Sequence, residues 1–430
     1  MISNLTKAVK IPQLRNKIIF TLAILAFYRF LAHVPVPNTN TEALNQFFQS
    51  NQILNLLNVF MGGGLSNLSL VAAGVGPYIS ASIIIQILTY IVPKLEEIAK
   101  DGSQGRQKIN QYTRYLTLPI AIIQAYTMYT LISRQDYVGV PLVNLESPID
   151  LILIILAMTA GTYLLIFLGE MITEYGVGQG ISVIIFAGIL AGLPGSLGGL
   201  ITISNISQFL PILVFILVVL TVIGSVVYVN EAYRKIEIQY SRRITGGQTF
   251  AGGRSYIPIK INQAGVIPII FAVSLVLIPN FLAGFLQQQS SEILVNIGVW
   301  LSTNFSPGSP YYNIFYFLLV FGFTFFYTSI AFNPEKIADD IRKSGGFIPG
   351  IRPGKATENY LRYVINRLTL AGGIFLGLIA VMPTVVQSIT GIAALSVGGT
   401  GVLIVVSVVL ETVKQIESQV ISREYQSITS

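Results

Sequence analysis

Long apolar runs alternate with short polar or glycine-rich stretches along this chain, and the runs have the length of membrane spans. A helix rises about 1.5 Å per residue, so about 20 apolar residues cross a hydrocarbon core. The runs predict ten spans, Ile18–His33, Pro77–Val92, Leu116–Ile132, Leu151–Leu168, Ile181–Leu193, Phe209–Tyr228, Ala264–Phe285, Tyr311–Phe332, Leu368–Val386 and Ile392–Val413. This pattern predicts an all-α polytopic membrane protein.

One apolar stretch, Met61–Ile91, is broken in the middle. Glycines open it at 62–64 and interrupt it again within Gly74–Pro77. The piece between them, Leu65–Ala73, would rise only about 14 Å as a helix, which is about half of a hydrocarbon core. It is either a half-helix buried in protein or beside a water-filled cavity, or one arm of an ordinary Gly/Pro kink. The stretch alone leaves both interpretations open.

Composition agrees with the membrane assignment and limits the chemistry. Of the 430 residues, 53% are hydrophobic and 10% are charged, whereas soluble domains carry about a quarter charged residues. There is no cysteine and the only histidine is His33, so we expect no disulfide, no metal site and no other cofactor. Basic residues precede a full-length first span without a small-residue cleavage site, so no cleavable signal peptide is predicted.

Lysine and arginine gather on one side of the predicted membrane. They occupy the N-terminal tail, the loops Pro93–Tyr115, Val229–Gln263 and Asn333–Arg367, and the C-terminal tail, while the opposite loops carry only Arg134. Positive loops stay in the cytoplasm, so both termini are predicted to be cytoplasmic. The agreement supports the span count, because one missed span would reverse every later loop.

Ten spans divide into five and five, and an odd number per half inverts the second half relative to the first. We expect the halves at 1–195 and 196–430, with the functional site between them near the midplane. The cytoplasmic loop 229–263 predicts a β-hairpin, because alternating residues are apolar before a glycine turn. The loop 333–367 predicts a helix followed by a Gly/Pro-rich segment, and the outer loop Leu286–Pro310, with the only tryptophan, an amphipathic surface helix.

The spans lack the groups that catalysis or ion-coupled transport needs. They hold no cysteine and no carboxylate pair, so we expect no enzymatic activity. Arg29 is the clear ionisable residue inside a span, with Glu170 and Glu411 near cytoplasmic ends. We expect Arg29 to bind carbonyl groups of the broken stretch, while a role in transport stays open as the alternative. The uncharged interior favours a passive channel, while an inverted-repeat secondary transporter of a small solute stays open as the alternative.

Several long motifs resemble one family. They are PYISASIIIQILT (Pro77–Thr89), GRQKINQYTRY (Gly105–Tyr115), GISVIIFAGILAGLP (Gly180–Pro194), INQAGVIP (Ile261–Pro268), KSGGFIPGIRPG (Lys343–Gly354) and GGTGVLIVVSVVLETVKQIESQ (Gly398–Gln419). The chain resembles the SecY family, the channel subunits of the bacterial and thylakoid protein translocase, related to the alpha subunit of the eukaryotic translocon. The resemblance covers nearly the whole chain.

The resemblance implies two inverted five-helix halves around a central hourglass pore, closed by a short half-helix plug. The implied pore ring is Val75, Ile79, Ile185, Ile189, Ile270 and Ile404, where position 75 departs from the commoner isoleucine. The implied plug is Leu65, Ser66, Asn67, Leu68, Ser69, Leu70, Val71, Ala72 and Ala73, with hinges at Gly62, Gly63, Gly64, Gly74 and Gly76. The implied lateral gate, between spans two and three and spans seven and eight, includes Gln86, Gln124 and Ser274.

The resemblance also implies the function and the partners. The channel would pass unfolded preproteins with signal peptides and release apolar segments sideways into lipid, driven by the SecA ATPase or by a ribosome. The implied docking residues are Arg242, Arg243 and Arg352, and contact with ribosomal RNA through the basic loops would be salt-sensitive. SecE and SecG are the implied subunits. The implied location is a bacterial plasma membrane, with a thylakoid membrane as the alternative.

Overall fold

The computed structural model describes residues 10–429 except 38, 51–57, 59–61, 134–135, 138–139, 143–146, 203–208, 241–242, 246–247, 251–253, 277, 288, 290, 307–308 and 391–393. Its helices are α2 (Pro12–Leu31), α3 (Thr41–Ser50), α5 (Gly76–Ile91), α6 (Pro93–Lys100), α7 (Gly102–Ser133), α8 (Pro148–Tyr175), α9 (Gly180–Thr202), α10 (Phe209–Glu231), α11 (Ile267–Val276), α12 (Ile278–Leu286), α13 (Glu292–Asn304), α14 (Pro310–Ala331), α15 (Pro334–Lys343), α16 (Lys355–Thr390) and α17 (Ala394–Thr429). Its strands are β1 (Asp136–Tyr137), β2 (Val140–Pro141), β3 (Tyr233–Tyr240), β4 (Arg243–Thr245), β5 (Gln248–Phe250), β6 (Arg254–Lys260) and β7 (Gly346–Phe347).

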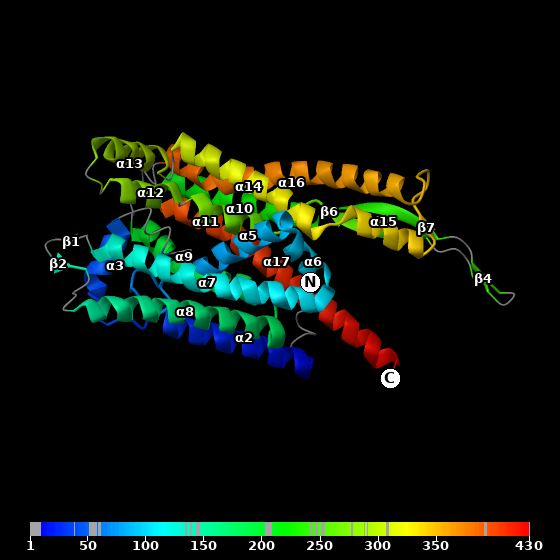
Figure 1. Ribbon diagram of the computed structural model, residues 1–430, viewed down its shortest axis with the longest axis horizontal. Helices are drawn as coiled ribbons and strands as arrows, with labels where there is room; N and C mark the ends of the chain where they lie inside the picture. The colour runs from blue at the N-terminus through cyan, green and yellow to red at the C-terminus, as the bar shows by residue number, and fades with distance from the viewer. Residues whose placement is uncertain are drawn as a thin grey trace.

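The long helices run side by side along the longest axis of the molecule (Figure 1). The helices α3, α12 and α13 lie at one end, and α15 with the strands β6 and β7 lies at the other. Each predicted span falls on a helix, and the seventh is shared by α11 and α12. The chain therefore has the mostly helical architecture that the apolar runs predicted.

Several helices begin at a polar residue followed by proline. Ser147 precedes α8, accepts from the amide of Ile149, and is joined by Asp150 in a capping box. Ser309 precedes α14 and Asn333 precedes α15 in the same way, each with proline at the next position. A capping oxygen satisfies an amide that has no partner within the helix, and proline fits the first turn because it needs none. The sequence thus fixes where these helices start.

By length and hydropathy, three helical stretches in the described part of the chain are able to cross a membrane alone: Pro148–Tyr175, Pro310–Lys343 and Lys355–Gln387. The helices α5 and α6 form a fourth if they count as one span, although they are bent by 101°. Shorter apolar helices cover other predicted spans at Gly180–Gly192, Ile216–Glu231 and Ile267–Val276. The chain is a multi-pass integral membrane protein.

The predicted half-helix at Leu65–Ala73 is wrong in one respect: this segment is a series of turns and not a helix. Its amides donate to carbonyls three residues back, as in Leu68 to Leu65 and Ala72 to Ser69. Leu68 has a positive φ of 39°, which interrupts a right-handed helix. The interruption frees backbone groups of the segment to pair with another part of the chain.

The predicted β-hairpin in the loop 229–263 is confirmed, and the structure adds a third strand. The strands β3 and β6 pair antiparallel with Ile236 opposite Ile257, and β7 from the second large loop pairs with the other edge of β3. Buried Ile236, Ile259 and Leu361 form a separate small core between this sheet and the α15–α16 region. The two basic loops are therefore one folded unit.

Candidate functional site

The six residues of the expected pore ring gather in one apolar cluster. Val75, Ile79, Ile185, Ile189 and Ile404 are buried in the main core, and Ile270 is partly buried and packs against it. They come from the start of α5 and from α9, α11 and α17, so four separate elements converge there. Branched apolar side chains offer neither water nor a peptide a hydrogen-bond partner. These six residues therefore add no polar group to the apolar cluster.

The turn segment 65–73 lies packed in the same core. The side chains of Leu65, Leu68 and Val71 are almost fully buried. The backbone is held by the segment that follows α2, because the amide of Val36 donates to Leu68 O and the amide of Leu70 donates to Val34 O, each at 3.0 Å. The segment is thus fixed by contacts with residues more than 30 positions away.

Two glycines allow helices to approach this segment closely. A Cβ at Gly161 of α8 would lie 1.8 Å from the carbonyl oxygen of Leu70, and a Cβ at Gly188 of α9 would lie 2.6 Å from Cα of Gly62. Any side chain at either position would overlap the backbone of the turn segment or of its hinge. The sequence analysis did not single out these glycines, because the element that each contacts is distant in the chain.

Arg29 binds the broken stretch as the sequence predicted. Its Nη1 donates to the carbonyl oxygen of Gly62 at 2.9 Å. Gly62, Gly63 and Gly74 have positive φ values of 80°, 77° and 58°, so these hinge positions favour glycine. The side chain of Arg29 therefore bonds to a backbone segment with positive φ, a conformation that glycine adopts easily.

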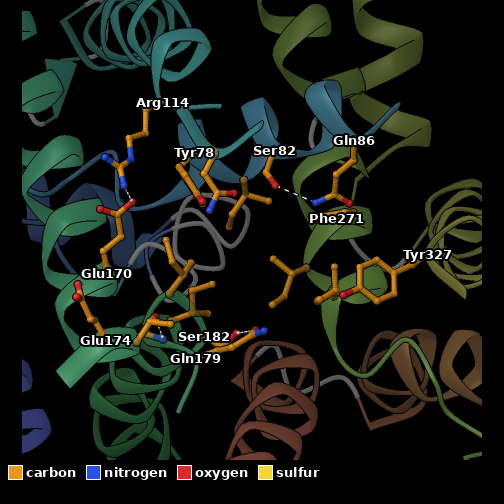
Figure 2. Close-up of a pocket in the computed structure, with 18 residues that line it drawn as sticks. Tyr78, Ser82, Gln86, Arg114, Glu170, Glu174, Gln179, Ser182, Phe271 and Tyr327 are labelled. Carbon is orange, nitrogen blue, oxygen red and sulfur yellow. Dashed lines mark hydrogen bonds and ion pairs between the residues drawn. The ribbon is translucent and has the colours of Figure 1, made fainter. Parts of the chain in front are cut away.

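A cavity of about 700 Å³ lies beside the apolar cluster, because Ile79, Ile185 and Ile270 line it. Ser82 and Gln86 of α5 also line it (Figure 2). Those two side chains are four residues apart and face the same way, with Gln86 Nε2 donating to Ser82 Oγ at 3.0 Å. The lining of the cavity therefore combines polar and apolar side chains.

Charged residues from two helices, α7 and α8, line this cavity. Arg114 of α7 and Glu170 of α8 point toward one another in Figure 2 and form an ion pair at 2.6 Å. Glu174 lies one helical turn beyond Glu170 and also lines the cavity, as does Gln179 in the turn before α9. Glu170 and Glu174 are four residues apart in the segment GEMITEYGVGQG, and this spacing is the sequence signal for their shared face. The sequence analysis singled out only Glu170.

A seam separates α5 from α11 and α14 beside the cavity. The centroids of the aromatic rings of Tyr90 on α5 and Phe326 on α14 lie 6.4 Å apart, in the edge-on geometry typical of such pairs. Of the expected gate residues, Gln86 lines the cavity, and Ser274 bonds back to Ile270 O of its own helix. Gln124 instead lies beside Gly76, where α5 begins.

The structure describes two of the three expected docking residues. Arg352 is exposed in the loop between β7 and α16, and its carbonyl accepts from Thr357 Oγ1 at 2.9 Å. Arg243 is the first residue of β4, and Arg242 lies outside the described residues. The exposed position of Arg352 allows contact with a partner.

A polar network that the sequence analysis missed joins the base of the sheet to α17. Asn262 donates to Asn230 Oδ1 at 2.9 Å, and Asn230 donates to Ser407 Oγ at 3.3 Å. Asn262 Oδ1 also accepts from the amide of Gly265 at 3.0 Å, just before α11. Since Ser407 is three residues from Ile404, this network links the sheet to the helix that carries part of the apolar cluster.

Among the described residues, no group of three or more histidine, aspartate or glutamate side chains is placed to hold a metal ion. The described residues place a cavity with charged, polar and apolar lining beside an apolar cluster that also packs against the turn segment.

Comparison with known proteins agrees with this arrangement. A family model described as SecY matches residues 69–413. The protein translocase subunit SecY of Streptomyces griseus is 41% identical over 438 residues, covering 99% of each chain. That of Mycobacterium tuberculosis is 40% identical over 443 residues, again covering 99% of each chain.

Solved structures share the fold. A protein-conducting channel matches with a TM-score of 0.62 at 21% identity, over 94% of this chain and 91% of that one. Sec61 in the canine ribosome–channel complex from the endoplasmic reticulum matches with a TM-score of 0.60 at 19% identity, over the same 94% and 91%.

Proposed function

The chain belongs to the SecY family, and from this premise we propose that it is the protein-conducting channel of a protein translocase. It passes unfolded preproteins across the membrane and releases apolar segments into lipid. The observation that supports the proposal is the cavity of about 700 Å³ that is lined both by polar and charged side chains and by Ile79, Ile185 and Ile270 of the apolar cluster. The relatives that match over the full length are translocase subunits, so the small-solute transporter has no support.

The pore ring performs two tasks in this proposal. Val75, Ile79, Ile185, Ile189, Ile270 and Ile404 give a moving peptide no strong partner, so that any sequence slides past them. An apolar constriction also disfavours a continuous column of water and ions, which gates by dewetting. The ring therefore limits leakage without binding the cargo.

The turn segment 65–73 is the plug. A solved SecY structure that matches this chain with a TM-score of 0.62 at 22% identity is described as one whose plug domain stabilises the closed channel and maintains a membrane seal. Burial of Leu65 and Leu68 and the hydrogen bonds to Val34 and Val36 support the same role here. The plug moves on the glycine hinges when a preprotein enters.

The lateral gate is the seam between α5 and α7 on one side and α11 and α14 on the other. The Tyr90–Phe326 pair closes it at the level of the cavity, and opening it exposes the wall that carries Gln86 to lipid. An apolar segment leaves there because its side chains need no hydrogen-bond partner among the lipid tails. The halves 1–195 and 196–430 separate along this seam.

An apolar groove on another side supports SecE as a partner. The groove, of about 200 Å³, lies between α2, α9 and α17 and is lined by residues such as Leu22, Phe186 and Val409. Leu22 and Val409 are exposed, so a partner helix has access. Because α2 and α9 belong to the first half and α17 to the second, a helix seated there clamps both halves. SecG is proposed as the further subunit.

The cytoplasmic unit of β3, β6, β7 and α15 is the docking surface for SecA or a ribosome. Arg352 is exposed there, and Arg243 begins β4 in the loop 229–263. Arg242 lies outside the described residues and is proposed from the sequence alone. Two fold neighbours, canine Sec61 and yeast Ssh1, are described in ribosome complexes. The energy comes from such a partner, and the channel subunit itself catalyses no reaction. The protein spans a bacterial plasma membrane, and both termini lie on its cytoplasmic side.

Reconstitution tests the proposal. The purified chain is placed in liposomes with SecE and SecG, and SecA, ATP and a preprotein with a signal peptide are added outside. Protease protection of the preprotein is the expected result, and it requires both ATP and SecA. Uptake of a small solute along an ion gradient by the chain alone, without protected preprotein, contradicts the proposal.

A further inference from the structure

The helix α13 carries an exposed apolar stripe at the end of the molecule opposite the cytoplasmic sheet (Figure 1). Ile293, Ile297 and Trp300 are spaced by four and three residues, so they share one face of the helix. They are 72%, 45% and 53% exposed. Glu292 and Thr303 lie on the neighbouring polar side of the same helix. Such a division of faces is typical of helices that lie flat in a membrane interface.

The other side of α13 is occupied by α12, which fixes the direction of the stripe. Gln287 Nε2 donates to the carbonyl oxygen of Gly298 at 3.0 Å and to Ser302 Oγ at 2.9 Å. A Cβ at Gly298 would lie 2.9 Å from the carbonyl oxygen of Ala283, so the two helices are in close contact. A rotation of α13 that turned its apolar stripe inward would therefore break these contacts.

The stripe continues onto the lipid-facing side of α14. Tyr311, Ile314 and Leu318 share a face at the start of that helix and are 55%, 60% and 56% exposed. The ring of Trp300 lies 6.2 Å from the ring of Tyr311. The helix α14 belongs to a stretch that crosses the membrane, so its first turn marks the outer boundary of the bilayer. Tryptophan and tyrosine are enriched at that boundary.

We propose that α13 lies at the membrane–water interface on the outer side of the membrane that the chain spans, with its stripe of Ile293, Ile297 and Trp300 in contact with lipid. The occupant of the stripe is the lipid surface, because the stripe is continuous with the lipid-facing surface of α14. Interfacial helices bury their apolar face about 5–10 Å into the boundary between headgroups and acyl chains. The helix α13 packs against α12, and α12 follows α11 directly, so lipid contact at α13 anchors the outer end of α11 beside the lateral gate.

The single tryptophan makes this directly measurable, because Trp300 is the only indole in the chain. The full chain is reconstituted in vesicles of phosphatidylcholine and phosphatidylglycerol whose acyl chains carry bromine near the headgroup, at mid-chain or near the terminal methyl. Lipid contact predicts loss of most indole fluorescence with bromine near the headgroup and less loss with deeper bromine. It also predicts a blue-shifted emission and little quenching by aqueous iodide.

Two matched variants complete the test. Ile297→Glu places a charge in the stripe and should abolish quenching by brominated lipid, while Val299→Glu adds the same charge at an exposed position about 100° around the helix from Trp300, outside the stripe, and should leave quenching unchanged. A wild-type indole quenched by iodide and not by brominated lipid overturns the proposal and leaves the stripe to a protein partner. Equal quenching in Ile297→Glu and the wild type overturns it as well. Neither outcome depends on translocation activity.

Discussion

The contact between Gly161 and the plug gives the sharpest prediction. In Gly161→Ala, the new Cβ would lie 1.8 Å from the carbonyl oxygen of Leu70 and 2.6 Å from its carbonyl carbon. Ordinary contact requires a separation larger by roughly 1.5 Å, so α8 and the plug must move apart. Alanine is a better helix former than glycine by about 1 kcal/mol, so α8 itself is not weakened. The plug is the element that gives way.

The size of the effect follows from the bonds that hold the plug. The 3.0 Å hydrogen bonds from Val36 to Leu68 and from Leu70 to Val34 do not survive a shift of that size. Each contributes about 0.5–1.5 kcal/mol, and the shift that breaks both bonds also relieves the overlap, so the cost is that of the two bonds. The seated plug should therefore lose about 1–3 kcal/mol, which lowers the ratio of seated to unseated plug by about 5- to 150-fold.

Two measurements check this in the reconstituted channel. Resting ion conductance in planar bilayers should rise in Gly161→Ala. The chain has no cysteine and Ser69 is fully buried, so Ser69→Cys adds a single thiol whose maleimide labelling reports plug release. That labelling should accelerate in the Gly161→Ala background. Gly322→Ala is the matched control, because a Cβ there meets nothing within 4 Å. Unchanged conductance and labelling in a folded Gly161→Ala protein would refute the reasoning.

Three further predictions follow from the same structure. Arg29→Met removes the charged donor at the plug hinge, which is worth about 1.5–3 kcal/mol, and should accelerate labelling of the Ser69→Cys thiol by at least about tenfold; equal rates would show that the bond does not hold the plug. Ile404→Asn places a polar group in the ring and should raise resting conductance and relax selectivity for signal peptides, and a conductance equal to wild type argues against dewetting. Arg352→Glu should impair SecA-driven translocation at unchanged thermal stability, whereas Lys355→Glu, a nearby exposed charge reversal, should have a smaller effect; normal precursor-stimulated SecA ATPase activity in Arg352→Glu removes the docking assignment.

The sequence by itself determined where the helices lie and which loops share a side of the membrane. Hydropathy and the positive-inside rule depend on each segment alone, so a run such as Pro310–Ala331 can be predicted as a membrane span without knowledge of its neighbours in space. Proline and capping residues likewise set the helix starts. The role of Arg29 was also predictable, because an isolated charge within a span needs a polar partner and the broken stretch is the nearest source of free carbonyls.

Only the tertiary structure decided how the broken stretch folds. Leu65–Ala73 has the composition of a short helix, yet its backbone pairs with Val34 and Val36 and adopts turns, because those bonds come from a segment that sequence spacing does not place. The same reason hid the contact of Gly161 with the plug and the pairing of β7 with β3. Each depends on the close approach of residues far apart in the chain, and local propensity carries no information about such distances.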